Sequence, residues 1–178
     1  MKIIIPFSAI KKIYISSPQD GEIMGIIHSN DNINYNKVLI SHKDDHKGNE
    51  CRLDDIVVGT VSFHTHPKIC YDIYKTNVGW PSLDDLMAFC NEDNMKVLIV
   101  PALEGVYVIA KKRKIKAETV KKITQTYKNY ISKENNSIKE YIDIINDVCN
   151  GCIVLIFFSK DTITKENPNT KITLEVID

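Results

Sequence analysis

The sequence has no excess of charge of either sign, because Lys plus Arg and Asp plus Glu both number 23. Without a net electrostatic field, attraction to nucleic acid or to an anionic membrane surface is not expected. The sequence also lacks any run of about eighteen apolar residues, so no transmembrane helix is predicted. Lys11 and Lys12 interrupt the apolar N-terminal stretch before it reaches the length of a secretory signal. We therefore expect an intracellular, cytoplasmic protein, in the host cell if the source is viral.

A disulfide framework is not expected either. The five cysteines cannot all pair, and nothing points to an oxidising compartment. The Cys149-Asn150-Gly151-Cys152 segment has the spacing of a redox or zinc half-motif. No second pair accompanies it, however, and Asn-Gly is typical of a turn between a helix and a strand. Reduced, structural cysteines are predicted.

The chain of 178 residues is 43% hydrophobic and 26% charged, which is typical of a folded globular protein. Repeats and low-complexity linkers are absent from the sequence. One domain spanning residues 1–178 is predicted, and the alternative is that residues 132–178 form an added C-terminal subdomain. The sequence leaves the oligomeric state open.

Hydrophobic periodicity and turn signals predict a mixed sheet flanked by helices, an α+β fold. Helices are expected over residues 8–15, 82–91, 114–131 and 137–149. Residues 42–50 and 67–81 are expected to be loops. The predicted strands are residues 2–5, 21–28, 35–41, 56–63, 96–101, 106–111, 152–158 and 171–177.

Two histidines follow the predicted strand 56–63. His64 and His66 are two residues apart, so in extended chain their side chains project to the same side. A single histidine beside an apolar strand is usually structural. A second histidine on the same face favours a metal site, although a structural role for both stays open.

Ser82 and Asp85 have the spacing of a helix-opening motif, in which a hydroxyl and a carboxylate cap the first turn. That structural role alone would explain the pair. If the helix start lies close to the end of the histidine strand, Asp85 joins His64 and His66. Two histidines, one carboxylate and one open position are the ligand set of a catalytic zinc site.

The order of these residues resembles a known family. The sequence places a glutamate on an early strand, then His-x-His-Pro, then Ser-x-x-Asp, at Glu22, His64, His66, Ser82 and Asp85. This pattern is similar to that of the JAMM metalloproteases, also called the MPN+ domain. The resemblance implies an MPN domain with a cytidine-deaminase-like fold. The motif covers residues 21–86, and the similarity extends loosely to about residue 131.

The resemblance implies a role for each residue. His64, His66 and Asp85 would hold one Zn²⁺ per chain and leave a position for water, whose pKa zinc lowers to about 7. Glu22 would act as general base and then as general acid. Ser82 would stabilise the oxyanion, in competition with its role as a helix cap. Without the resemblance, the sequence around Glu22 predicts only an ordinary turn residue.

The segment 67–81 is longer than the usual link between these motifs in the family. It contains Tyr71, Tyr74 and Trp80, which we expect to contact substrate if the segment is a flap. The alternative is a longer surface loop.

The resemblance implies a zinc-dependent isopeptidase that removes ubiquitin or a ubiquitin-like modifier from lysine side chains, so these conjugates are the expected partners. A second enzyme hypothesis keeps the metal chemistry but takes a small peptide, a sulfur-carrier conjugate or a cysteine-derived molecule as substrate. A third hypothesis is a non-catalytic MPN scaffold module, which would not need the metal ligands.

Overall fold

The computed structural model describes residues 1–17, 21–43, 58–132 and 137–178. The helices are α1 (Phe7–Ser16), α2 (Lys68–Tyr74), α3 (Leu83–Asn91), α4 (Ala117–Ile131), α5 (Ile138–Cys149) and α6 (Lys160–Lys165). The strands are β1 (Lys2–Pro6), β2 (Ile23–Ser29), β3 (Tyr35–Lys43), β4 (Val61–His64), β5 (Val97–Ala102), β6 (Gly105–Lys111), β7 (Ile153–Ser159) and β8 (Lys171–Glu175).

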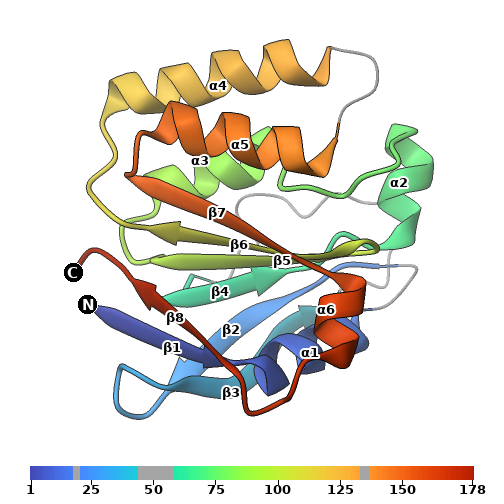
Figure 1. Cartoon of the computed structure of the whole chain (residues 1–178), viewed down its shortest axis with the longest axis vertical. Helices are drawn as coiled ribbons and strands as arrows, with labels where there is room; N and C mark the ends of the chain where they lie inside the picture. The colour runs from blue at the N-terminus through green and yellow to red at the C-terminus, as the bar shows by residue number, and fades with distance from the viewer. Residues whose placement is uncertain (18–20, 44–57, 133–136) are drawn as a thin grey trace.

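Six strands form one mixed sheet in the order β3-β2-β4-β5-β6-β7 (Figure 1). β4 and β5 run parallel, whereas the other neighbouring strands of this sheet are antiparallel. β1 and β8 pair antiparallel as a separate two-stranded ribbon. The predicted α+β fold, a mixed sheet flanked by helices, is confirmed.

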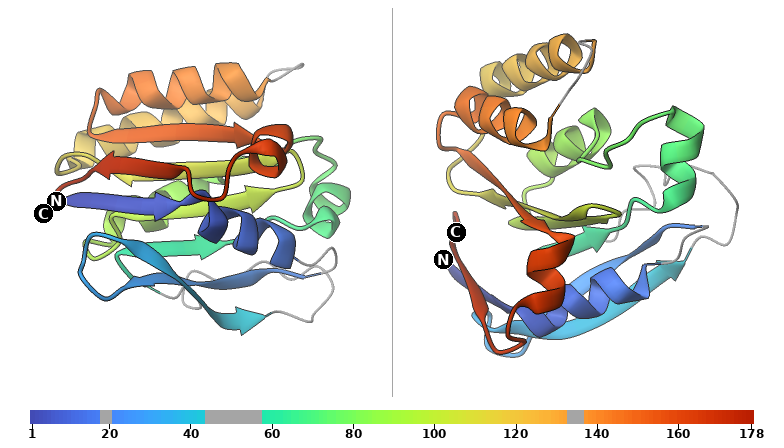
Figure 2. Two further views of the ribbon diagram at one scale, coloured as in Figure 1. Left: turned by 60° about the horizontal axis from the view of Figure 1, so that its bottom comes forward. Right: turned by 45° about the vertical axis from the view of Figure 1, so that its right-hand side comes forward.

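The sheet is covered on both faces (Figure 2). Along β5, Val97 and Ile99 join one hydrophobic cluster, whereas Leu98 and Val100 join another, because successive side chains point to opposite faces. The first cluster lies under α1, α6 and the β1–β8 ribbon. The second lies under α3, α4 and α5. A strand buried on both faces is apolar along most of its length. Every residue of β5 and β6 is buried, with Lys111 at the end of β6 as the charged exception.

Some predicted boundaries are wrong. The segment 67–81, predicted to be a loop, contains helix α2. Helix α6 likewise occupies part of the predicted loop between the last two strands. The histidine strand begins at Val61 rather than at residue 56. Residues 44–50 of the predicted loop 42–50, and residues 56 and 57 of the predicted strand, lie outside the described residues.

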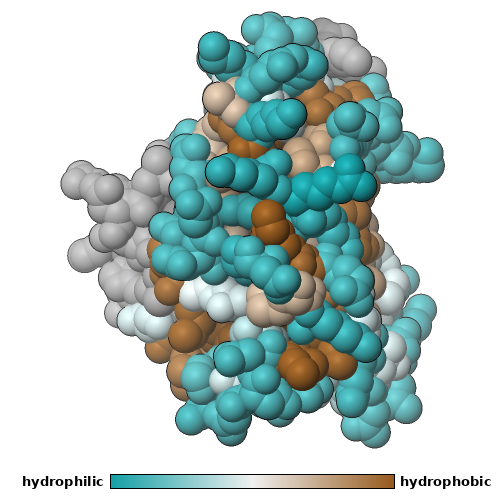
Figure 3. All heavy atoms as spheres, turned by 90° about the vertical axis from the view of Figure 1, so that its left-hand side faces the viewer, coloured by the Kyte–Doolittle hydropathy of each residue, from teal (hydrophilic) through white to brown (hydrophobic). Residues whose placement is uncertain are grey.

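Residues 137–178 contribute to the packing on both faces of the sheet. α5 packs on α4 and β7, β7 is the sixth strand of the sheet, and β8 pairs with β1. Across the described ranges, no helix has the length and apolar character needed to cross a membrane. The face opposite α2, which carries both termini, is mostly hydrophilic, with its apolar side chains in separate small groups (Figure 3).

Candidate metal centre

The chain stays extended past the end of β4, which places both histidines on one side. Thr65, between them, is fully buried and exchanges two hydrogen bonds with Ile23. Its N–H donates to the Ile23 carbonyl at 3.0 Å, and its Oγ1 accepts from the Ile23 N–H at 3.0 Å. The N–H of His66 donates to the carbonyl of Pro101, in β5, at 2.8 Å. The histidines therefore lie at the carboxyl end of the parallel β4–β5 pair, where binding sites of such sheets commonly form.

The start of α3 brings a carboxylate to the same place. Ser82 Oγ accepts from the Asp85 N–H at 3.1 Å, and Asp85 Oδ2 accepts from the Ser82 N–H at 2.6 Å. These reciprocal bonds form a capping box, which satisfies two backbone donors that a helix start leaves free. The box also fixes the Asp85 side chain, so its second oxygen points to a defined position.

The three side chains converge. His64 Nε2 lies 3.2 Å from His66 Nε2 and 3.0 Å from Asp85 Oδ1, and His66 Nε2 lies 3.3 Å from Asp85 Oδ2. Their side chains are only 6%, 14% and 12% exposed, in the order His64, His66 and Asp85. One ligand atom from each lies within 4.8 Å of the others. This buried His-His-Asp group could hold a metal ion.

The orientation of His66 suits a ligand. Its Nδ1 lies 2.9 Å from the carbonyl of Gly79, and since a carbonyl only accepts, Nδ1 carries the proton. In the neutral ring the Nε2 lone pair then faces His64 and Asp85. His64 Nδ1 is buried and has no hydrogen-bond partner among the described residues. At a separation of 3.2 Å the lone pairs of the two Nε2 atoms repel each other, unless one nitrogen carries a proton or a cation lies between them.

The electrostatics of the metal-free group agree with this geometry. Burial opposes the charged form of His66, but the hydrogen bond and charge of Asp85, together with the charge of Glu22, raise the pKa of His66 to about 9. Burial also opposes ionisation of Asp85, yet His64 and His66 hold the pKa of its carboxyl well below the usual range. The metal-free group therefore pairs the Asp85 carboxylate with the imidazolium of His66.

Glu22 lies immediately before β2, opposite His66. Met24 pairs with His64 and Ile23 bonds with Thr65, so the antiparallel register places Glu22 across from His66. Residues directly opposite each other project to the same face of a sheet. Glu22 is 7% exposed, and its Oε1 accepts from the thiol of Cys70, in α2, at 3.5 Å. A second, shielded carboxylate therefore stands beside the His-His-Asp group.

No family model, curated protein or solved structure matches this chain. The functional interpretation therefore depends on the geometry and on the residue pattern. The geometry brings together the four predicted residues His64, His66, Asp85 and Ser82, with Glu22 on the adjoining strand end.

The aromatic residues of segment 67–81 make contacts within the fold. Tyr71 is buried, donates its hydroxyl proton to Glu104 and accepts from the Leu103 N–H at 2.9 Å. Trp80 is half-buried and stacks on Tyr141 of α5, with ring centroids 4.8 Å apart. The side chain of Tyr74 lies outside the described part of the chain. Contact of these three residues with substrate stays a prediction.

Sequence reasoning missed several residues around the centre. Cys70 and Gly79 lie in a segment that carries no motif, and Glu104 lies in the connection between the predicted strands 96–101 and 106–111, where no motif marks it. The hydroxyl of Tyr141 donates to the Pro81 carbonyl at 2.7 Å, so α5 supports the residue before the helix cap. These partners are distant in sequence, and no local pattern predicts them.

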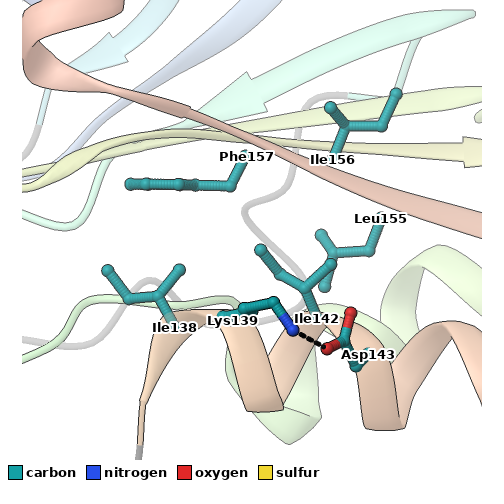
Figure 4. Close-up of a pocket in the computed structure, with 7 residues that line it drawn as sticks. All are labelled: Ile138, Lys139, Ile142, Asp143, Leu155, Ile156 and Phe157. Carbon is teal, nitrogen blue, oxygen red and sulfur yellow. Dashed lines mark hydrogen bonds and ion pairs between the residues drawn. The ribbon is translucent and has the colours of Figure 1, made fainter.

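A cavity of about 460 Å³ lies elsewhere, between α5 and β7 (Figure 4). Ile138 and Ile142 of α5 face Leu155 and Phe157 of β7, and the ion pair between Lys139 and Asp143 lies at its side. β7 is the edge strand, three positions from β4 in the sheet. None of the described residues that line the cavity is a histidine or a cysteine, and it is not part of the metal centre.

Proposed function

We propose that this protein is a zinc-dependent hydrolase of amide bonds, of the JAMM type, that acts on isopeptide bonds of ubiquitin or ubiquitin-like conjugates. The convergence of His64, His66 and Asp85 beside the buried carboxylate of Glu22 carries the proposal. A mixed sheet with its histidine strand followed by a capped helix is also what an MPN domain would require. The isopeptide substrate depends on the family resemblance alone.

The donor set suits zinc. Two imidazole nitrogens and one carboxylate oxygen are the protein ligands of many catalytic zinc sites, in which a fourth position stays open. The Gly79 carbonyl fixes the His66 ring as expected for a metal ligand, whose other nitrogen usually donates to a carbonyl or carboxylate. The carboxylates of Asp85 and Glu22, which raise the pKa of His66, would also offset the charge of a cation held beside them.

Zinc bound by these three residues would acidify a water molecule and polarise the carbonyl of the scissile bond. Glu22 is a base of suitable position, since it faces the same side as His66 and is shielded from solvent. It would take the proton of the attacking water and deliver it to the departing amine of the lysine side chain. Because Cys70 bonds to Oε1 of Glu22, that transfer would use the second carboxylate oxygen, Oε2.

Ser82 can act as cap and as catalytic donor together. In the capping box its Oγ is the acceptor, which leaves the hydroxyl proton available to another acceptor. That proton would be donated to the carbonyl oxygen of the scissile bond as negative charge develops on it. The roles of helix cap and catalytic donor, which the sequence left as alternatives, are therefore compatible in this geometry.

Cleavage of isopeptide-linked and linear ubiquitin dimers, with and without a chelator, tests the proposal. We expect chelator-sensitive cleavage of isopeptide linkages that returns on addition of zinc, with one zinc per chain by metal analysis. A panel of short peptides, sulfur-carrier conjugates and cysteine derivatives distinguishes the other metal-dependent substrates. A purified protein that binds no zinc would refute the proposed enzyme and favour a scaffold module.

A further inference from the structure

Glu104, in the turn between β5 and β6, holds the segment that lies against the metal centre. Its Oε1 accepts from the Gly79 N–H at 2.8 Å and from the Tyr107 hydroxyl at 2.7 Å. Its Oε2 accepts from the hydroxyl of Tyr71, in α2. The carboxylate therefore joins three parts of the chain: the hairpin turn, α2, and the residues that follow α2.

The two phenol groups are suited to donate to this carboxylate. Burial, together with the charge of Glu104, raises the pKa of both Tyr71 and Tyr107, so both keep their protons. The Tyr71 hydroxyl also accepts from the Leu103 N–H. The phenol rings and the turn thus form a closed hydrogen-bonded unit around Glu104, which gives the carboxylate a fixed position.

Gly79 connects this unit to His66. Its N–H donates to Glu104, whereas its carbonyl accepts the Nδ1 proton of His66 at 2.9 Å. A Cβ at this position would lie 2.1 Å from the Tyr71 Oη, so only glycine allows Tyr71 and the backbone to approach so closely. The position of the Gly79 carbonyl therefore depends on both Glu104 and Tyr71.

We propose that Glu104 is a positioning residue for the metal centre: through Gly79, its carboxylate fixes the ring orientation of His66 and keeps the ring proton on Nδ1. Nε2 is thereby left to face the other ligands. The inference deepens the proposed function and rests on its metal site. It concerns a residue that contacts neither the metal ligands nor a reacting atom.

The first test is the zinc affinity of Glu104→Ala, measured by competition with a chelating dye. Loss of a group that orients a ligand typically weakens metal binding by about 10–100-fold, and we expect that range here. Glu104→Gln keeps an oxygen that can accept from the Gly79 N–H, so its affinity should stay within about threefold of wild type. Glu166→Ala is a matched control, because Glu166 also accepts a local hydrogen bond, from Thr170 at 2.7 Å. It should bind zinc as the wild type does.

The second test needs no metal. In chelator-treated protein labelled with ¹⁵N-histidine, the Nδ1 proton of His66 should give a slowly exchanging signal in the wild type and in Glu166→Ala. That signal should be lost, or exchange much faster, in Glu104→Ala. Gly79→Ala should have the same effect, since its Cβ would displace the carbonyl that accepts this proton. It replaces Glu104→Ala if that variant does not fold.

The outcomes separate the two proposals. A wild-type protein without zinc affinity refutes the metal site, and the histidine signal still decides whether Glu104 orients His66. Unchanged zinc affinity together with an unchanged Nδ1 signal in both Glu104→Ala and Gly79→Ala would overturn the positioning role. Equal losses in Glu166→Ala would show a general effect of destabilisation and would also overturn it.

Discussion

Replacement of Asp85 by asparagine separates the electrostatic role of this residue from its role as a helix cap. Asparagine retains one oxygen of the carboxylate, which can still accept from the Ser82 N–H that Oδ2 now accepts at 2.6 Å. The amide nitrogen would then replace Oδ1, which lies 3.0 Å from His64 Nε2. The cap survives, but a donor faces the lone pair that a metal would need.

The stability that Asp85→Asn removes from the metal-free protein follows from the pKa of His66. Its pKa is raised from 6.5 to about 9, chiefly by Asp85 acting against burial. A histidine whose pKa is higher in the folded state than in the unfolded state stabilises the folded protein fully at a pH below its unfolded-state pKa. This stabilisation disappears as the pH rises through its folded-state pKa. At pH 7 the shift corresponds to about 2–3 kcal/mol, which Asp85→Asn should largely remove. At pH 10 only the smaller loss of charge at the helix start, about 0.3–1 kcal/mol, should remain.

Thermal unfolding of chelator-treated protein at pH 7 and pH 10 tests this reasoning. At pH 7, Tm should fall by about 5–10 °C, and at pH 10 by much less. Asp84→Asn is the matched control: Asp84 lies in the same helical turn and is exposed, so only a small change is expected at either pH. An equal loss at both pH values would refute the buried ion pair, as would a loss no larger than that of Asp84→Asn. Zinc affinity of Asp85→Asn should fall by more than about 100-fold.

Three further variants test other parts of the site. Glu22→Gln should keep zinc binding but lower kcat by about 10²–10⁴-fold, and near-normal turnover would show that Glu22 is not the base. Tyr141→Phe leaves the buried Pro81 carbonyl without its donor at a cost of about 1–3 kcal/mol, which urea unfolding should detect as a lower midpoint. Thr65→Val should cost a similar amount, because the Ile23 N–H loses its acceptor; an unchanged midpoint would mean that water replaces the hydroxyl.

The parts of the site that the sequence predicts are those with local causes. Alternation along a strand places His64 and His66 on one side, and the spacing of Ser82 and Asp85 produces the capping box. These short-range rules place two ligands together and put the third at a helix start, but that the helix start lies beside the end of β4 depends on the fold. The position of Glu22 opposite His66 depends on the register between two strands about forty residues apart, which no local pattern specifies.

The helices that the sequence missed have weak local signals. α2 has the sequence Lys-Ile-Cys-Tyr-Asp-Ile-Tyr, rich in β-branched and aromatic residues, and its N-cap, Pro67, offers no side chain that can accept a hydrogen bond. Tertiary contacts of Tyr71 support it instead. α6 is only six residues long and includes two threonines, although Ser159 caps it. The packing of the whole fold overrides propensity in both places.

The partners of Glu104 could not be predicted for a related reason. Its hydrogen bonds reach Gly79 and Tyr71 across 25 and 33 positions, and only the Tyr107 bond is local. A glutamate before a glycine indicates a turn and nothing more. Side chains that organise a site from outside it are recognised only when the fold brings their partners together.

The ribbon of β1 and β8 has a consequence for the order of folding. Met1 and Val176 bond across 175 positions, and this ribbon supplies Ile3, Ile5 and Leu174 to the hydrophobic cluster beneath it. Closing so large a loop is entropically costly and slow, so contacts of this range form late. During synthesis, the apolar side chains of β1 lack their partner strand until β8 has been made. We expect one face of the sheet to stay incompletely covered until then, which makes it the face that a chaperone would have to protect.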